Sequence, residues 1–289
     1  MAANISSLEE QVFEFAAFMK NVDMFPVFFT AHVSLACLVV REDSKDLGTK
    51  FRQNHPFTLW LCTVIASVSG VFLANFLFGD PLVDILKENK LIAFITILWY
   101  LINYCPFDVV YKVVALRPVF LTAAILQECL RLRFIYLGVQ QAAKLYPTGY
   151  VIIIIGGVIK GNGYGFVKIV ERLIRGKWIP TTNDLLDITY FAKSSLYASV
   201  LFLLQHMEVL AVPVELLYLG IVVAFVTLRL IIVLGGVRDP LLPIELPICT
   251  LLFGSGAEDK DTGKTDGVVK KEKVIKNGND REKQDKKIK

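Results

Sequence analysis

The sequence predicts an all-α membrane protein with seven transmembrane helices, arranged as an inverted three-plus-three helix repeat followed by a seventh helix. Hydrophobic residues make up 54% of the 289 residues, and the mean hydropathy of +0.54 is too high for a soluble domain of this length. Apolar segments of about 20 residues, long enough to cross the hydrocarbon core of a bilayer, recur along the chain. The connecting segments are alternately rich and poor in basic residues, as in membrane proteins with several spans.

The chain begins with an amphipathic stretch, Ile5 to Lys20, which is not apolar enough to span a membrane. Seven apolar segments follow, at residues 25–40, 57–78, 91–116, 118–143, 149–173, 185–206 and 213–234. The third is interrupted at Cys105-Pro106 and Asp108, and the fourth carries charged residues that leave it doubtful on hydropathy alone. Because a proline and an acid both suit a helix N-terminus, we expect Asp108 to cap a helix that restarts there.

The short flanks of these segments hold eleven Lys and Arg residues on one side of the membrane and four on the other, with the polar tail left out. The positive-inside rule then places the N-terminus in the lumen or outside and the C-terminus in the cytosol. The first residues show no basic start followed by a cleavable apolar run, so we expect no signal peptide. From Gly254 onward the composition turns to Lys, Asp, Glu, Gly and Asn, which predicts a disordered tail.

Two stretches of the chain carry turn residues in the same register. Gly79-Asp80-Pro81 and then Asp84 precede one apolar run, whereas Gly176, Pro180 and Asp184 precede another. Tandem units of three helices must have opposite orientations, because three is odd, and such inverted repeats place a polar site at mid-membrane. The predicted organisation is a lumenal amphipathic N-terminus (1–24), a first repeat (25–116), a second repeat (117–210), a seventh helix (211–236), and a cytosolic segment with a disordered polar tail (237–289).

The segment from Gly156 to Gly165 is costly at membrane depth, because it holds five glycines and Lys160. Each glycine weakens a helix by about 1 kcal/mol relative to alanine, and a charge at the bilayer centre costs at least about 2.5 kcal/mol. One interpretation is a helix whose glycines admit close neighbours. The other is a bent helix that lines a polar pathway, since broken helix is tolerated where it is buried in protein or faces a water-filled cavity.

The fourth apolar segment carries a polar face. Arg131 is four residues from Gln127 and three from Glu128, so both pairs share one side of a helix. This face is consistent with a packed interior ion pair, or with groups that face a water-filled pathway or a lipid head group. Arg133 lies nearly opposite, where we expect a subunit contact or a snorkelling side chain. Lys193 in the sixth segment is consistent with either a pathway or a structural ion pair.

The sequence shows no signature of catalysis. It has no Ser/His/Asp spacing, no phosphate-binding loop and no paired carboxylates, so we expect neither an enzyme nor a cofactor of catalysis. The five cysteines lack the spacing of metal or redox sites and are interpreted as small hydrophobic residues. We expect structural roles for His32 and His206, no metal site and no nucleic-acid partner.

Short motifs spread over residues 22–236 are shared with one family of membrane proteins. In chain order they are Met24-Phe25-Pro26 with Ala31-His32, Trp99-Tyr100, Cys105-Pro106-Phe107-Asp108, the glycine segment, Glu171-Arg172-Leu173, Gly176 with Trp178, Ala192-Lys193 and Gln205-His206. Each motif alone would be weak, but together and in this order they are specific. The chain resembles the trimeric intracellular cation channels of the endoplasmic and sarcoplasmic reticulum.

The resemblance implies a homotrimer in the reticulum membrane, with one pore in each seven-helix subunit and K⁺ flux that balances charge during Ca²⁺ release. In that family a Lys-Glu-Val sequence, followed one residue later by Arg, binds a phosphoinositide beside the pore. Here Gln127-Glu128-Cys129 and Arg131 stand at those positions, and the missing lysine weakens the expected lipid binding. The expected residues for phosphatidylinositol 4,5-bisphosphate are Gln127, Arg131, Lys160, Gly161 and Gly163, and the expected pore-lining residues are Glu128, Asn162 and Lys193. The alternative is an alternating-access secondary transporter built on the same inverted repeat.

Overall fold

The computed structural model describes residues 2–48, 50–178, 186, 188–237 and 239–254. Every regular element within these residues is a helix, as the sequence predicts. The chain divides into two compact units, Met1–Asp239 and Pro240–Lys289. The predicted disorder of the tail, and the repeat residues Pro180 and Asp184, lie outside the described residues.

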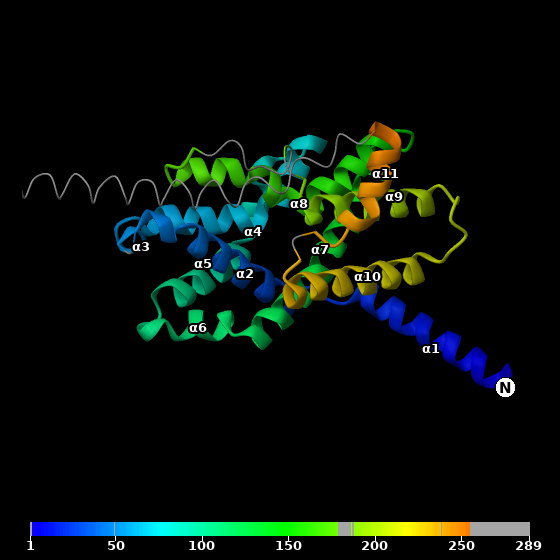
Figure 1. Ribbon diagram of the computed structural model, residues 1–289, viewed down its shortest axis with the longest axis horizontal. Coiled ribbons are helices and arrows are strands. Elements are labelled where there is room, and N and C mark those ends of the chain that lie inside the picture. Colours follow the sequence, from blue (N-terminus) through cyan, green and yellow to red (C-terminus); the bar gives the residue numbers. More distant parts are fainter. Residues whose placement is uncertain (1, 49, 179–185, 187, 238, 255–289) are drawn as a thin grey trace, which may run out of the picture. The chain divides into compact units, whose positions relative to one another are not determined.

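Figure 1 labels most of the helices along the chain. In chain order they are α1 (Ala2–Asn21), α2 (Val27–Asp43), η1 (Lys45–Leu47), α3 (Phe51–Asn54), α4 (Pro56–Phe78), η2 (Leu82–Lys87), α5 (Asn89–Tyr104), η3 (Pro106–Asp108), α6 (Val109–Ala115), α7 (Arg117–Leu145), α8 (Tyr150–Ile174), α9 (Tyr190–His206), α10 (Val214–Gly235) and α11 (Leu242–Phe253). Helices α4 and α7 begin with a proline in the first turn, where its missing N–H leaves no hydrogen bond unmade. Helix α11 belongs to the second unit.

Helix length and hydropathy support some of the seven predicted crossings. Within the described residues, α4, α8 and α10 are long and apolar enough to cross a membrane, and the pair α5 and α6 is a fourth candidate. Helices α2 and α9 have 17 residues each, which corresponds to about 25 Å at about 1.5 Å per residue. Helix α7 is longer but carries Glu128, Arg131 and Arg133. The seven-span arrangement therefore stays a prediction.

The predicted interruption of the third segment is present as a sharp bend. Helix α5 and the segment Pro106–Ala115 meet at 90°, and the chain turns through Phe107 and Asp108, whose φ angles are 57° and 55°. The predicted restart is present, because α6 begins directly after Asp108, but the Asp108 side chain makes no capping hydrogen bond to α6. The Asp108 carboxylate instead pairs with Arg41 at 2.9 Å and with Arg52 at 3.6 Å. Two guanidinium groups outcompete the helix N-terminus for this carboxylate.

Helices α4 and α8, which the sequence repeat makes equivalent, end in the same backbone arrangement. Gly79 follows α4 with a φ of 76°, and Gly176 stands just after α8 with a φ of 77°. In both cases the residue after the glycine donates its N–H to the carbonyl five residues earlier, at 2.9 Å. This helix ending requires a positive φ, which glycine adopts without steric cost. The matched turn residues of the sequence thus correspond to matched helix ends.

Helix α8 packs against α4, α7 and α9 (Figure 1). Its crossing with α4 is a contact of backbones. A Cβ atom on Gly70 would lie 2.5 Å from the carbonyl oxygen of Lys160, and one on Gly163 would lie 2.3 Å from the Cα of Gly70. The crossing with α7 is as close, since a Cβ on Gly138 would lie 2.5 Å from the carbonyl oxygen of Gly156. Small residues at such crossings are typical of helices packed in a membrane.

Candidate functional site

Helix α8 departs from helical geometry at Asn162, where φ is −130° and ψ is 26°. The residue lies between Gly161 and Gly163, and glycine has a low helix propensity, so the helix is weakest here. The side chain of Asn162 is only 8% exposed, which places a polar amide inside the bundle. The bend predicted for the glycine segment is therefore present and is confined to one residue. The close-packing interpretation of the glycines holds as well, because Gly163 contacts α4.

A cavity of about 360 Å³ lies against this break. Its wall is formed by α2, α4, α7 and α8, with further residues from the start of α9 and from α10. The polar and charged residues of the wall are His32, Ser67, Ser69, Gln127, Arg131, Lys160, Asn162, Tyr164, Lys168, Thr189 and Arg229. Four of these are Lys or Arg, and within the described residues no Asp or Glu belongs to the wall. We call this positively charged space the pore cavity, after the polar pathway that the sequence predicts beside α8.

Arg131 enters the pore cavity from α7 and is fixed by several acceptors. Its guanidinium donates to Glu128 Oε2 from Nε at 2.9 Å and from Nη2 at 2.5 Å. Its Nη1 atom donates to the hydroxyls of Ser194 and Ser195 on α9, at 3.0 and 3.1 Å, and to the carbonyl of Phe191 at 3.1 Å. Arg131 thus satisfies both interpretations of its helix face. It forms an interior ion pair with Glu128, and it also lines a polar cavity.

Arg229 on α10 is a second guanidinium at the same carboxylate. Its Nε atom lies 3.7 Å from Glu128 Oε1, and the side chain of Glu128 has no exposed surface. Two cations therefore share one buried anion, which leaves a formal excess of one positive charge at the cavity wall. The sequence analysis did not single out Arg229. The signal was present, since Arg229 is a basic residue deep within α10, whose other charged residue, Glu215, lies in the first turn.

Lys160 has a defined partner within the bundle. Its Nζ atom donates to Gln141 Oε1 on α7 at 2.6 Å, and Gln141 donates in turn to Asp80 Oδ2 at 2.8 Å. This chain of hydrogen bonds connects the break in α8 to the end of α4. It also gives the charged Lys160 side chain, which is costly in an apolar segment, a partner inside the bundle. Sequence reasoning missed Gln141 and Asp80, because their link to Lys160 spans three helices.

The remaining predicted lipid-binding residues also line the pore cavity. Gln127, Gly161 and Gly163 belong to its wall together with Arg131 and Lys160. The two glycines are tightly contacted from behind. A Cβ on Gly161 would lie 2.2 Å from Cγ1 of Ile135, so this position has no room for a side chain. The structure therefore brings all five of these residues and Asn162 to one space.

Two predicted pore-lining residues do not belong to the wall of the pore cavity. Glu128 lies behind it, because its carboxylate is held between Arg131 and Arg229. Lys193 pairs with Asp239 at 2.7 Å, and both side chains are largely buried. Of the two interpretations left open for Lys193, the structure thus places it in an ion pair.

A second buried ion cluster joins the end of α8 to the end of α2. The side chains of Glu171 and Arg175 have no exposed surface, and Arg175 Nη2 lies 2.6 Å from Glu171 Oε2. Asp43 at the end of α2 lies 3.7 Å from Arg175 and 3.4 Å from Lys168, which also lines the pore cavity. Arg175 donates to Ser44 Oγ as well, at 3.3 Å. The cluster closes the bundle beside the cavity.

A surface contact lies next to this cluster. Lys177, after α8, donates from Nζ to the carbonyl oxygen of Asp43 at 2.9 Å and also to the carboxylate of Asp46. The hydrogen bond from Lys177 holds the pKa of the Asp46 carboxyl below its ordinary value of 3.8. The two segments that follow α2 and α8 are thereby linked.

The sequence of this chain matches one family model, that of the TRIC channel, over residues 45–236. It is 38% identical over 238 residues to trimeric intracellular cation channel type 1B.2 of Caenorhabditis elegans, which covers 82% of this chain and 76% of that protein. It is 32% identical over 243 residues to trimeric intracellular cation channel type A of Homo sapiens, which covers 84% and 81% of the two chains.

The fold is similar to solved structures. One is a trimeric intracellular cation channel from C. elegans in the absence of Ca²⁺, with a TM-score of 0.73 and 36% identity over 80% of this chain and 99% of that chain. Another comes from work on the structural basis for activity of TRIC counter-ion channels in calcium release. Its TM-score is 0.73 and its identity 28%, over 78% of this chain and 99% of that chain.

Proposed function

This chain belongs to the TRIC channel family, and we propose that it conducts monovalent cations, K⁺ above all, across a reticulum membrane. The flux would balance charge while Ca²⁺ is released, as for one structural neighbour, which is described as a counter-ion channel in calcium release. We further propose a homotrimer with one pore in each subunit, in line with relatives named as trimeric channels. The pore proposed for each subunit is the pore cavity, which is lined by α2, α4, α7 and α8.

The observation that carries this proposal is the break of α8 at Asn162 beside the pore cavity. Irregular backbone at membrane depth is tolerated where it faces water or is buried in protein. Here it meets polar side chains from α4 and α7, two helices that contact α8 directly. An ion crossing the membrane needs such a run of polar groups in place of its hydration shell.

The basic wall is unusual for a cation pathway, and we propose that an anionic phosphoinositide offsets it. All five residues expected to bind this lipid line the pore cavity, and guanidinium groups bind phosphate with strong, charge-assisted hydrogen bonds. A head group with several negative charges would reverse the local potential and favour cations over anions.

This chain has Gln127 where the family has a lysine, and Arg229 is placed to compensate for the missing charge. Both residues line the pore cavity, and the Arg229 guanidinium shares Glu128 with Arg131. We propose that Arg229 supplies part of the positive charge that Gln127 lacks. The lipid site would then depend on two arginines from different helices, α7 and α10.

Recording from the purified full chain in a planar bilayer with K⁺ solutions tests the channel proposal. Unitary current steps are expected, with K⁺ carrying more current than Cl⁻. Saturable flux without unitary steps would favour the alternating-access transporter instead. Recording with and without phosphatidylinositol 4,5-bisphosphate in the bilayer then tests whether the lipid is needed for cation selectivity.

The orientation is tested separately. We propose that the N-terminus is lumenal and the C-terminus cytosolic, on the alternation of basic flanks. In sealed microsomes, protease is expected to remove a C-terminal tag and to spare an N-terminal one. The same protection of both tags would mean an even number of crossings and would contradict the seven-span proposal.

A further inference from the structure

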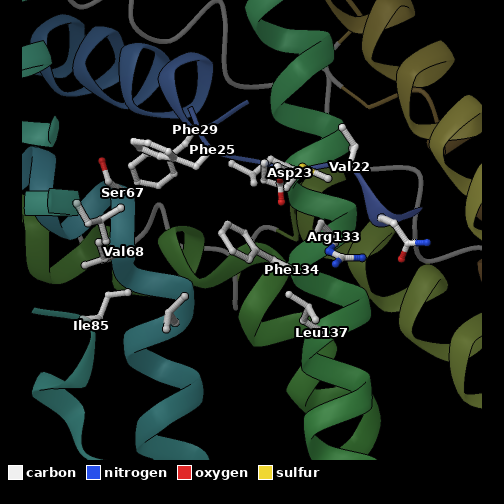
Figure 2. A pocket seen from close by; sticks show the side chains of 15 residues that line it. Val22, Asp23, Phe25, Phe29, Ser67, Val68, Ile85, Arg133, Phe134 and Leu137 are labelled. Carbon is white, nitrogen blue, oxygen red and sulfur yellow. The ribbon is translucent and has the colours of Figure 1, made fainter. Parts of the chain in front are cut away.

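A second cavity, the linker pocket, lies beside α2, α4 and α7 and is bounded by residues 21–25, which are the last residue of α1 and most of the linker to α2. Its volume is about 390 Å³. Figure 2 shows Phe25 and Phe29 on one side of the pocket, next to Ser67 and Val68, with Ile85 further along the same side. Asp23 and Arg133 lie on the other side. The two charged residues of the pocket thus lie on the same side, within a lining that is otherwise mostly apolar. The function proposed above does not use this pocket.

The charged side of the pocket holds one acid and one base. One N–H of the Arg133 guanidinium donates to the backbone carbonyl of Lys20, and no other hydrogen bond of this guanidinium is formed within the described residues. The Asp23 side chain is exposed. A hydroxyl group donates and accepts hydrogen bonds, so it can satisfy both residues. An anionic head group would meet Asp23, and a cationic one would meet Arg133, so charge complementarity favours a head group without net charge.

The pocket is open to the surroundings of the helix bundle on both sides. Phe25 is 54% exposed on one side, and Leu137, next to Arg133 and Phe134 in Figure 2, is 37% exposed on the other. Large exposed apolar side chains grouped around a hollow indicate a surface that another molecule covers. The volume is within the usual range for small-molecule sites, which are mostly apolar with a few polar groups.

From these observations we infer that the linker pocket binds a neutral amphiphile with a hydroxyl-bearing head at Asp23 and Arg133 and an apolar body against Phe25 and Phe29. A sterol and a monoacylglycerol share this chemistry. Leu130 and Phe134 line both the linker pocket and the pore cavity, so the occupant contacts the wall of the conduction path. Control of conduction through these two side chains rests on the proposed channel function, whereas binding does not.

Binding is tested on the full chain in detergent micelles with two photoactivatable probes, a sterol and a monoacylglycerol, each competed by its unlabelled parent. Leu137→Trp fills the pocket from a position outside the pore cavity. Its matched control is Ile97→Trp on α5, which is 58% exposed and borders neither cavity. Saturable labelling by one probe is expected, weaker by about tenfold in Leu137→Trp, or about 1.4 kcal/mol, and unchanged in Ile97→Trp.

Labelling that does not saturate, or that is equal in the two tryptophan variants, would overturn the inference. A second outcome would also overturn it: no labelling, together with efficient formation of disulfide-linked dimers by Leu137→Cys. A second copy of the chain would then cover the pocket. The probe that labels identifies the source of the amphiphile.

The control of conduction has its own readout. The labelling amphiphile is expected to change the open probability of the wild type and of Ile97→Trp in a planar bilayer, and to leave Leu137→Trp unaffected. Equal responses of all three proteins would refute the coupling through Leu130 and Phe134. A lack of current in all three, with saturable labelling intact, would refute the proposed channel function and leave the binding site standing.

Discussion

Two buried ion clusters of the first unit have opposite charge balance. The cavity cluster consists of Glu128, Arg131 and Arg229, and the end cluster consists of Asp43, Glu171 and Arg175. The end cluster has one cation between two carboxylates, and the extra carboxylate is completed by Lys168 of the same chain. The cavity cluster has two cations around one carboxylate, and both cations line the pore cavity. A cluster completed from within stabilises the fold, whereas one with excess charge at a cavity is available to a ligand.

The largest effect is expected on removal of the cation of the end cluster. Arg175→Met would leave Glu171 without its partner in a fully buried position. Breaking a buried ion pair in this way typically costs about 3–5 kcal/mol of stability. Denaturant-induced unfolding in detergent micelles measures the loss. The double variant Arg175→Met/Glu171→Gln is the control and should recover most of it. An unchanged unfolding midpoint in the single variant would show that the end cluster does not stabilise the fold.

Removal of one cation from the cavity cluster should act mainly on ligand binding. Arg131→Ala leaves Glu128 paired with Arg229, so the loss of stability should be smaller than in Arg175→Met. The lost charge-assisted hydrogen bond is worth about 1.5–3 kcal/mol, or roughly a ten- to hundredfold loss of phosphoinositide affinity. Titration of a fluorescent phosphoinositide measures this. A strongly destabilised Arg131→Ala with unaltered lipid affinity would mean that the two clusters play the same role.

Addition of a cation at the cavity should have a smaller effect of the opposite sign. Gln127→Lys places a second positive charge on the face of α7 that carries Arg131, and a charged hydrogen bond at the low end of the usual range would raise phosphoinositide affinity by roughly tenfold. The matched control is Gln127→Met, which keeps the length of the side chain without its charge. Equal affinities of the lysine and methionine variants would exclude Gln127 from the lipid site.

The smallest effect is expected at the surface beside the end cluster. The hydrogen bond from Lys177 lowers the pKa of Asp46 from its ordinary value of 3.8 in the folded protein. Its stabilising contribution is therefore fully present above that ordinary value and is lost as the pH falls through the lowered pKa. The melting temperature of the wild type should fall more between pH 5 and pH 3 than that of Asp46→Asn. If the melting temperatures of the two proteins fall in parallel with pH, the Lys177–Asp46 ion pair does not help to hold the two segments together.

The sequence was most informative where local chemistry decides the structure. The bend at Asn162 follows from the low helix propensity of its glycine neighbours, and the bend at Cys105-Pro106 follows from proline. The face shared by Gln127 and Arg131 follows from helical spacing alone. These features depend on residues within one turn of each other, so a single segment contains all the information.

The features that were missed depend on residues far apart in the chain. Asp108 was expected to cap α6, but Arg41 lies across the fold and takes its carboxylate. Lys193 finds Asp239 at a distance of 46 residues along the chain. Arg229 reaches Glu128 from another helix. In each case an ion pair between distant segments decides the direction of a charged side chain, and helical periodicity holds no information on such a pair.

The crossing of α4 and α8 divides the wall of the pore cavity into a fixed part and an adjustable part. At Gly70 and Gly163 the two backbones are in contact, with no side chain between them that could change rotamer. A shift of one helix against the other would therefore require both backbones to separate, which a tightly packed interior resists. The walls from α7 and α10 carry long side chains instead, Arg131 and Arg229. A rotamer change there needs no helix movement, but Arg131 would first have to give up its hydrogen bonds to Glu128, Ser194 and Ser195. Changes in the width of the proposed ion path are thus expected at the arginine side, whereas the α4–α8 crossing is expected to stay fixed.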